Sequence, residues 1–484
     1  MSMSWDKLLD PTRVRELDGG TQSNADHRTP FQQDFDRVVF SSPVRRLQDK
    51  AQVFPLEPND AVRTRLTHSM EVSTVARGIV QKISSLLDKE HPFVTRNQDI
   101  CDVAATAGLV HDLGNPPFGH FGEDAIREWF VDGKGKAAIA LLGKNAQMQA
   151  DIAVHEGNAR TIRLLCSLQV LADRYGLNIT VATLGASMKY VAPSHDFVKS
   201  EVDHTRSKPG YCWWEQPIVE GIREKTGIGN FRHPIAFIVE AADDCVYALC
   251  DLEDAVRKGI LSWPELKKVL LEQVEDPAGR TEFEGWLEKI VTFIDKRYNN
   301  SDIKPGLRAK DEAYAIWFRT IGQGLIINGA AKSFVGRYTE IMAGDFKGEL
   351  VTDKMHAPEA ERLISCSKKA SQNHVYPVRP NIELELKGRR VIHDLMDLLW
   401  IGIEQFDGKP PKSKNTPGKA WNILSENYRA LFESEWRRSV ETASKRNVDV
   451  CLLRHYLRLL LLTDYVGGMT DTFACTLHRS LNNG

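Results

Sequence analysis

Apolar residues recur three and four positions apart along most of this 484-residue chain, which is the spacing of a buried helix face. Asn59 or Asp60 is the expected N-cap of the first long helix. Pro234 in the first turn and Gly259 after the last delimit a later one. The pattern predicts helices over about 59–89, 99–113, from 122 onward, 156–175, 234–258, 390–406 and 448–465.

Signals for β-structure and for long loops are few. Two alternating segments, 178–182 and 382–386, are the candidates for a short strand pair. Polar or Gly/Pro-rich stretches predict loops or lids at 132–150, 191–232, 297–310 and 407–419, of which the last is the best linker candidate. The sequence therefore predicts an all-α fold with at most a short β-hairpin.

Composition narrows the class of protein without naming a function. The formal net charge is −2, so no overall positive field indicates nucleic-acid binding. The first residues are charged rather than apolar, and the aliphatic run Leu459–Leu462 is far too short to span a bilayer. Eight cysteines without a CxxC pair favour reduced, structural thiols. We expect a cytoplasmic protein with no membrane partner.

The first chemical signal is His111-Asp112, at the end of the apolar segment VAATAGLVHDLG. Adjacent helical side chains point about 100° apart and rarely share an ion. Here Gly114 and the pair Pro116-Pro117 end the helix at once, so both side chains are free to converge. An imidazole with a carboxylate suits Mn²⁺, Fe²⁺, Ni²⁺ or Zn²⁺. A surface pair without a metal is the alternative explanation of an isolated His-Asp dipeptide.

Three further features favour a metal site. Arg65 and His68 lie three apart on one face of a predicted helix. Asp243 and its neighbours Glu240 and Asp244 place carboxylates inside an otherwise apolar helix, where a buried carboxylate needs a cation. The segment after the two prolines adds His120 and Glu123.

The ordered set H…HD…D, with NPPFGHFGE after the HD pair, resembles the HD superfamily and specifically its deoxyguanosine triphosphate triphosphohydrolase branch. The segment 259–440 matches that branch loosely. The other matching segments are RRLQDKAQVFPLE at 45–57, RTRLTHSMEV at 63–72, HEGNARTIRLL at 155–165, EAADDCVYALCDLEDA at 240–255 and DYVGGMTD at 464–471.

The resemblance implies one triphosphohydrolase domain over residues 1–484. Its HD metal core would span 59–258, with an insertion at about 132–232, and additional helices would form the C-terminal region 259–484. The implied activity is metal-dependent hydrolysis of a deoxynucleoside triphosphate, such as dGTP, to deoxynucleoside and tripolyphosphate.

The resemblance assigns one divalent metal to His68, His111, Asp112 and Asp243. Asp244 is the nearest competitor of Asp243, since two adjacent carboxylates of a regular helix cannot both face one ion. The residues do not select among Mn²⁺, Mg²⁺, Ni²⁺, Fe²⁺ and Zn²⁺.

By resemblance, Tyr247 and Asp251 contact the sugar 3′-hydroxyl, and the aromatic ring closes against C2′ to reject a 2′-hydroxyl. Gln52 resembles a glutamine that contacts the nucleoside. Arg65 resembles the arginine that grips the α-phosphate, where a guanidinium can bind in bidentate fashion.

The remaining assignments concern catalysis and the triphosphate. His120 and Glu123 resemble the catalytic pair beside the attacking water. His155 stands where some relatives carry a histidine proposed to protonate the leaving 5′-oxygen and others carry an aromatic residue. The residues that resemble triphosphate ligands are Lys189, Tyr190 and Lys208.

Two alternatives stay open. One is an HD phosphohydrolase that acts on another nucleotide. The other is a nucleic-acid-binding regulatory protein with an idle site, since relatives bind single-stranded DNA and basic residues gather at 437–438, 445–446 and 454–458. Solvated helix faces are the more frequent explanation of such basic clusters. Family members form hexamers or tetramers, so we expect a homo-oligomer.

Overall fold

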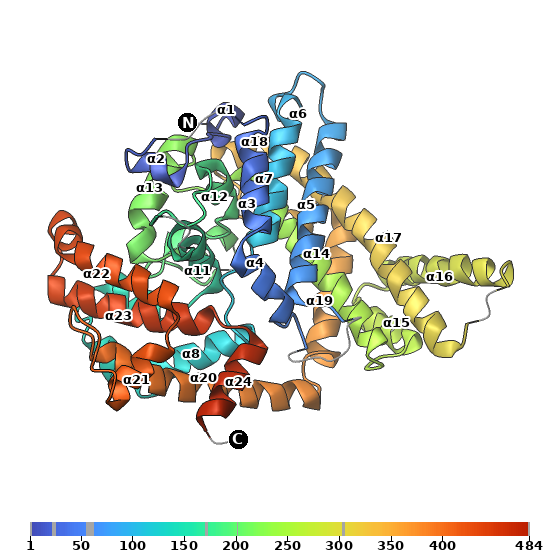
Figure 1. Cartoon of the computed structure of the whole chain (residues 1–484). Helices are drawn as coiled ribbons and strands as arrows, with labels where there is room; N and C mark the ends of the chain where they lie inside the picture. Colours follow the sequence, from blue (N-terminus) through green and yellow to red (C-terminus); the bar gives the residue numbers. More distant parts are fainter. Residues whose placement is uncertain are drawn as a thin grey trace.

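The computed structural model describes residues 2–21, 26–54, 62–169, 173–200, 202–302 and 305–482. Within these residues the chain forms 24 α-helices and one minimal sheet (Figure 1). The predicted all-α class is confirmed. None of the helices described is long and apolar enough to cross a membrane.

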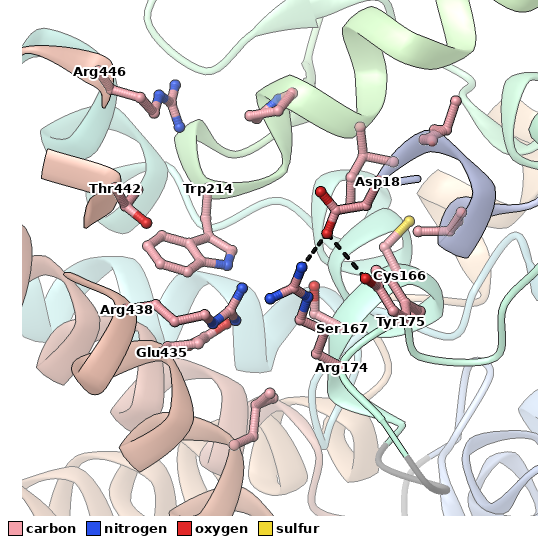
Figure 2. A pocket seen from close by; sticks show the side chains of 15 residues that line it. Asp18, Cys166, Ser167, Arg174, Tyr175, Trp214, Glu435, Arg438, Thr442 and Arg446 are labelled. Atoms are coloured by element: carbon pink, nitrogen blue, oxygen red, sulfur yellow. Dashed lines mark hydrogen bonds and ion pairs between the residues drawn. The ribbon is translucent and has the colours of Figure 1, made fainter. Parts of the chain in front are cut away.

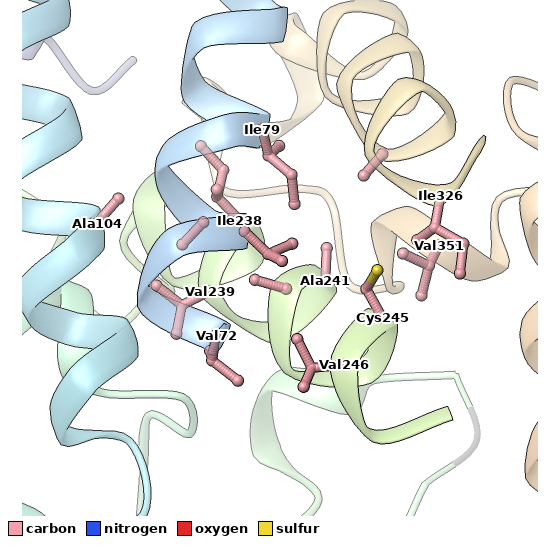
Figure 3. Close-up of a cluster of buried hydrophobic side chains, with 14 of the residues drawn as sticks. Val72, Ile79, Ala104, Ile238, Val239, Ala241, Cys245, Val246, Ile326 and Val351 are labelled. Carbon is pink, nitrogen blue, oxygen red and sulfur yellow. The ribbon is translucent and has the colours of Figure 1, made fainter. Parts of the chain in front are cut away.

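Four long helices form the centre of the molecule: α5 (Arg65–Leu86), α7 (Asn97–Val110), α14 (Pro234–Arg257) and α17 (Leu307–Gly336). They pack because α7 and α14 are apolar on nearly every side, so both must be buried. Figure 3 shows where their side chains meet. The labelled residues are buried and come from all four helices and the adjoining turn: Val72, Ile79, Ala104, Ile238, Val239, Ala241, Cys245, Val246, Ile326 and Val351.

Local chemistry sets the ends of α5 and α14. Thr64 caps α5, since its hydroxyl accepts a hydrogen bond from the backbone N–H of Thr67 at 3.4 Å. The predicted start near Asn59 or Asp60 is therefore wrong, and those two residues lie outside the described ranges. α14 begins at Pro234 as predicted, and Gly259 follows its end with a positive φ of 73°.

The segment 156–175 is not one helix, contrary to the prediction. α11 covers Gly157–Arg163, a π-helical turn covers Leu164–Leu168, and the helix ends there. The apolar spacing that suggested a longer helix continues past the point where the chain turns back, since Leu177 N–H donates to the Leu165 carbonyl.

The predicted strand pair is also wrong. Thr180 caps the helix α12 (Val181–Ser187), and this capping decides the local structure over the alternating pattern. Residues 382–386 belong to α20 (Arg379–Glu404), where Ile382 and Leu386 lie one turn apart and exposed. The strands lie elsewhere: β1 (Ala192–Pro193) pairs in parallel with β2 (Pro209–Tyr211).

The predicted loops contain more structure than expected. Residues 132–150 include α9 (Gly135–Ala140) and the start of α10 (Ala146–Ala153), and 191–232 include both strands and α13 (Gln216–Thr226). The stretch 407–419 is irregular until α21 (Thr416–Ile423) begins.

The chain after α14 packs in two places. Its first part includes the central helix α17 and adds four helices to the same hydrophobic cluster: α15 (Trp263–Glu272), α16 (Pro277–Asn299), α18 (Tyr338–Ala343) and α19 (Pro358–His374). Its second part forms a separate hydrophobic cluster with α8 (His120–Val131), α9 and α10. The helices of that part are α20, α21, α22 (Glu426–Arg446), α23 (Val450–Gly467) and α24 (Asp471–Leu481).

The remaining elements are short. Cysteines are free, as predicted, and all are buried except Cys451. The helices not yet given are α1 (Trp5–Leu8), α2 (Val14–Leu17), α3 (Pro30–Val39), α4 (Ser42–Arg46), α6 (Pro92–Thr95), and 3₁₀ turns at Leu47–Asp49, His204–Arg206, Trp213–Glu215 and Leu350–Thr352.

Candidate metal and nucleotide site

The four predicted metal ligands come together from three helices. Donor atoms of His68, His111 and Asp112 all lie within 4.8 Å of one another. Asp243 Oδ1 lies 3.2 Å from His68 Nε2 and 3.4 Å from His111 Nε2. His68 is in the first turn of α5, the HD pair follows α7, and Asp243 is in the middle of α14. Their packing, rather than proximity in sequence, builds the set.

The tautomer of His111 makes this set suitable for a cation. Its Nδ1 lies 2.7 Å from the Gly108 carbonyl, which can only accept, so Nδ1 carries the proton. Its buried Nε2 has no hydrogen-bond partner among the described residues and faces the carboxylates of Asp112 at 3.6 Å and Asp243 at 3.4 Å. A lone pair that faces two carboxylates needs either a proton or a metal between them. The residues present therefore fit a divalent cation.

The charges of the set are strongly coupled. Burial lowers the pKa of His111, but Asp112 and Asp243 outweigh it and raise that pKa to about 9. Burial raises the pKa of Asp112, but Arg65 and His111 bring it below the ordinary value. The two carboxylates thus favour a positive charge at His111 Nε2, and a metal that binds there would compete with a proton.

Asp243 and Asp244 face different partners. Asp244 Oδ1 accepts a hydrogen bond from Lys368 Nζ at 2.8 Å, away from the two histidines. Burial raises the pKa of Asp244 to about 6, although Lys368 and Lys189 favour its charged form. Of the two carboxylates, Asp243 contacts the histidines, as the sequence resemblance implied.

Arg65 reaches the metal set directly. Its guanidinium pairs with Asp112 Oδ2, and its Nε donates to the Ala51 carbonyl at 3.1 Å. Gly119, at φ 61°, makes room for it, because a Cβ there would lie 2.8 Å from Arg65 Nη2. Gly119 is thus favoured by its positive φ and by the arginine side chain beside it.

His120 and Glu123 form a pair at the start of α8. His120 Nδ1 lies 3.1 Å from Glu123 Oε2, with the imidazole largely exposed and the carboxylate buried. Glu123 Oε1 accepts the N–H of Gly157 at 2.9 Å. Burial raises the pKa of Glu123, yet His120 and Arg127 lower it below its usual value. The carboxylate therefore stays ionised and orients the imidazole.

The insertion supplies positive charge. Lys189 Nζ lies 3.6 Å from Asp243 Oδ2, and Lys208 Nζ lies 3.4 Å from Glu156 Oε1. Burial disfavours both charges, but nearby acids and the Tyr190 hydroxyl raise both pKa values. Tyr190 is buried, with Lys189 Nζ 6.0 Å from its ring.

Tyr247 and Asp251 lie four and eight residues after Asp243, on the same face of α14, and the three residues form the α14 stripe. Tyr376 donates its hydroxyl proton to Asp251 Oδ2 at 2.7 Å, and its ring lies 6.2 Å from that of Tyr247. Burial raises the pKa of Asp251 to about 8 although the Tyr376 hydrogen bond opposes this. The stripe thus runs from the metal set to an aromatic wall around a carboxyl.

The other two predicted residues, Gln52 and His155, make no hydrogen bond or ion pair with the four candidate metal ligands among the described contacts. Gln52 follows Lys50 and Ala51, whose carbonyls both accept from Arg65, and its Oε1 is buried without a described partner. The His155 imidazole is buried and lines a small cavity beside Gly467 of α23. Burial lowers its pKa well below the ordinary value, and Arg160 adds to this.

Sequence reasoning missed four residues around the site. Lys368 and Tyr376 lie in the segment 259–440, which matches the family only loosely, so no motif marked them. Lys50 Nζ donates to the carbonyls of Asn115 and Gly467, and burial lowers its pKa to about 7 with help from Arg65. Asn115 Nδ2 donates to Asp112 Oδ1 at 2.7 Å. The available signals were the motifs RRLQDKAQVFPLE, which contains Lys50, and NPPFGHFGE, which begins at Asn115.

Comparisons with known proteins agree with this geometry. A family model described as HD domain matches residues 65–155. A deoxyguanosinetriphosphate triphosphohydrolase-like protein of Listeria innocua is 36% identical over 99% of both chains. Deoxyguanosinetriphosphate triphosphohydrolases of Klebsiella pneumoniae (strain 342) and Yersinia enterocolitica are 32% and 30% identical, each over 93% of both chains.

A helical core that brings two histidines and two aspartates together, with an HD domain match over residues 65–155 that includes three of them, defines a hydrolase of the HD class. Within that class, the chain belongs to the deoxyguanosinetriphosphate triphosphohydrolase family.

Proposed function

We propose that this enzyme hydrolyses deoxynucleoside triphosphates, dGTP among them, to deoxynucleoside and tripolyphosphate, with one divalent metal held by His68, His111, Asp112 and Asp243. The observation that carries the proposal is the convergence of these side chains around the unpartnered Nε2 of His111. Relatives named deoxyguanosinetriphosphate triphosphohydrolase support the substrate class.

A bound Mn²⁺, Mg²⁺, Ni²⁺, Fe²⁺ or Zn²⁺ ion supplies Lewis acidity at the phosphoryl group. Water attacks the α-phosphorus in line with the 5′-oxygen, the bond to that oxygen breaks, and the deoxynucleoside leaves with a proton. Arg65, beside Asp112, is placed to neutralise charge on the α-phosphate. Lys189 and Lys208 bind the remaining phosphates. Lys368, which pairs with Asp244, is the fourth cationic side chain at the site.

Proton transfer falls to His120 and Glu123. The exposed imidazole can reach solvent or substrate, while Glu123 holds it in place. His155 takes no part in this proton transfer, because its imidazole is buried in the cavity beside α23.

Sugar selection falls to Tyr247 and Asp251. The carboxyl and the Tyr376 hydroxyl offer a donor and an acceptor for the 3′-hydroxyl. The paired rings of Tyr247 and Tyr376 leave a 2′-hydroxyl without a polar partner, which costs more than the loss of an apolar contact. Gln52 and Tyr190 complete the proposed contacts with nucleoside and triphosphate.

Product analysis tests the reaction. Purified enzyme with Mn²⁺ is expected to convert dGTP to deoxyguanosine and tripolyphosphate, resolved by ion-exchange chromatography and ³¹P NMR. Asp112→Ala should lower kcat/KM at least about 1,000-fold and lower metal content, because it removes a metal ligand. Asp99→Ala, at the opposite end of α7, is the matched control. Release of pyrophosphate or orthophosphate by the wild-type enzyme would refute the reaction.

Sugar discrimination is a separate test. Tyr247→Ala is expected to raise the kcat/KM of GTP relative to dGTP about tenfold or more, because the ring that opposes a 2′-hydroxyl is gone. Tyr298→Ala, on α16, is the control for loss of a tyrosine ring. An unchanged GTP-to-dGTP ratio in Tyr247→Ala would remove this residue from sugar selection.

We also propose a cytoplasmic homo-oligomer, a hexamer or tetramer, which light scattering after gel filtration would measure. Single-stranded DNA has weaker support as a partner. Arg454 and Arg458 lie over the Trp436 ring at 4.9 Å, and Lys445 pairs with Glu441 at 2.7 Å, so much of the predicted basic surface has partners within the chain. Salt-sensitive DNA binding that survives chelation of the metal would favour it.

A further inference from the structure

A second cavity lies apart from the metal set, between α2, α13, α22 and the segment after α11 (Figure 2). Its volume is about 230 Å³, and it opens to solvent. None of the residues that line it belongs to the metal set or the sugar-binding stripe. They are Val14, Leu17, Asp18, Cys166, Ser167, Arg174, Tyr175, Trp214, Pro217, Ile218, Leu431, Glu435, Arg438, Thr442 and Arg446.

One face of α22 gives the cavity its positive charge. Arg438, Thr442 and Arg446 lie four residues apart in succession, so they share one stripe of the helix. Arg446 donates to the Trp213 carbonyl and to Gln216 Oε1, both at 2.7 Å, and both partners are neutral. Arg438 makes no ion pair or hydrogen bond with any residue in the described part of the chain. Neither guanidinium is paired with a carboxylate.

The acids at the cavity do not cancel this charge. Asp18 already pairs with Arg174 and accepts from the Tyr175 hydroxyl at 3.0 Å. Glu435 lies 3.5 Å from the buried Arg163, which also binds Asp464 and Glu215. Burial raises the pKa of Glu435 and brings that of Glu215 to about 7. Because Arg163 already holds Glu435, the charge of Arg438 remains for a ligand.

An aromatic and aliphatic wall lies beside the arginines of α22. Figure 2 shows the Trp214 indole extending into the cavity next to Arg438, with Asp18 and Arg174 across from it. Apolar side chains from α2, α13 and α22 complete the wall: Leu17, Ile218 and Leu431. A flat indole face with aliphatic neighbours suits a planar ring, and the Arg438 guanidinium beside it suits an anion.

We propose that this cavity binds a small phosphate monoester of a single-ring aromatic compound, with the ring against Trp214 and the phosphate at the Arg438 guanidinium. A phosphate monoester is favoured over a carboxylate because its charge approaches −2 at neutral pH, so the Arg438 guanidinium attracts it more strongly. A single ring is favoured because the cavity is somewhat smaller than the ~300–1,000 Å³ of drug-sized sites.

Calorimetric titration of the full-length enzyme with phenyl phosphate tests the site. Phenyl phosphate is expected to bind at least tenfold more tightly than inorganic phosphate or phenol, because each of these lacks one half of the ligand. Arg438→Ala should weaken the binding at least tenfold, and Trp214→Ala should do the same while Trp214→Phe retains most of it. Arg437→Ala, the exposed neighbour of Arg438, should leave the affinity unchanged.

The phosphate ligands of the catalytic site provide the last control. Lys189→Ala should leave the phenyl phosphate affinity unchanged if the ligand occupies the second cavity. Loss of binding in Lys189→Ala together with normal binding in Arg438→Ala would place the ligand at the catalytic site and overturn the proposal. Absence of binding by the wild-type protein, or equal affinity for inorganic phosphate, would also overturn it. Circular dichroism of each variant verifies that it is folded.

Discussion

Asp251 combines a proposed role in substrate binding with an unfavourable environment. Its side chain is buried on α14 and accepts a hydrogen bond from Tyr376. Burial raises its pKa to about 8, and Asp254 adds to the effect while the Tyr376 hydrogen bond opposes it. A carboxyl that is protonated in the free enzyme can both donate to and accept from a sugar hydroxyl. The buried Asp251 carboxyl therefore lowers the free energy of unfolding at high pH, where it must ionise.

Asp251→Asn is expected to remove that cost. Between the unfolded value near 4 and about 8, the folded carboxyl keeps a proton that the unfolded chain has lost, so the free energy of unfolding falls as pH rises through this window. The asparagine does not titrate, so the variant should exceed the wild-type enzyme by about 1–3 kcal/mol at pH 9 and match it more closely at pH 5. Urea unfolding at both pH values measures this, and an identical pH dependence of the two proteins would contradict it.

The element that decides the metal site is the turn between α7 and α8. α7 ends at Val110, and the chain passes so close to α11 that a Cβ on Gly114 would lie 2.1 Å from the Gly157 carbonyl oxygen. Gly114 N–H also donates to Thr161 Oγ1 at 3.0 Å. The turn that allows His111 and Asp112 to converge is therefore held against α11 by backbone contact.

Gly114→Ala is expected to destabilise the protein by about 3 kcal/mol or more and to reduce metal content, because backbone atoms on α11 cannot move aside as a side chain would. Gly78→Ala in α5 is the control. Its new Cβ meets only the Ile327 Cδ1 at 3.8 Å, so helix propensity should stabilise it by about 0.5–1 kcal/mol. Thermal unfolding and metal analysis measure both, and equal stability of the two variants would show that the turn can relax.

At the scale of the whole molecule, Arg163 joins distant parts of the chain. From α11 it contacts Glu215 beside α13 at 2.8 Å, Glu435 on α22 at 3.5 Å and Asp464 on α23 at 2.7 Å. All four side chains are buried. The C-terminal helices are thus attached to the HD core by polar contacts as well as by the second hydrophobic cluster.

Arg163→Met should destabilise the protein by about 3–5 kcal/mol, because it leaves three buried acids without their shared cation. Lys134→Ala breaks the largely exposed pair with Asp397 and should change stability by less than about 1 kcal/mol. Chemical denaturation of both variants measures the contrast. A small effect of Arg163→Met would mean that the acids are neutral and satisfied without it.

Local sequence was sufficient for most of the helices and for the metal set. α7, α14 and α23 follow from apolar spacing together with a proline or glycine at an end, because these effects act within one or two turns. His68, His111 and Asp112 followed from short motifs. The predictions failed where a cap or a turn competed with periodicity, as at Thr180 and after Leu168.

What the sequence alone determined is the all-α class and the main helices, because each depends on neighbours close in the chain. Motifs and resemblance named the four candidate metal residues, but only the tertiary structure showed that Asp243 rather than Asp244 contacts the histidines. It also brought Lys50, Lys368 and Tyr376 to the site and opened a second cavity beside α22. These features arise from contacts between residues that are tens to hundreds of positions apart, and such contacts exist only once the hydrophobic helices have packed.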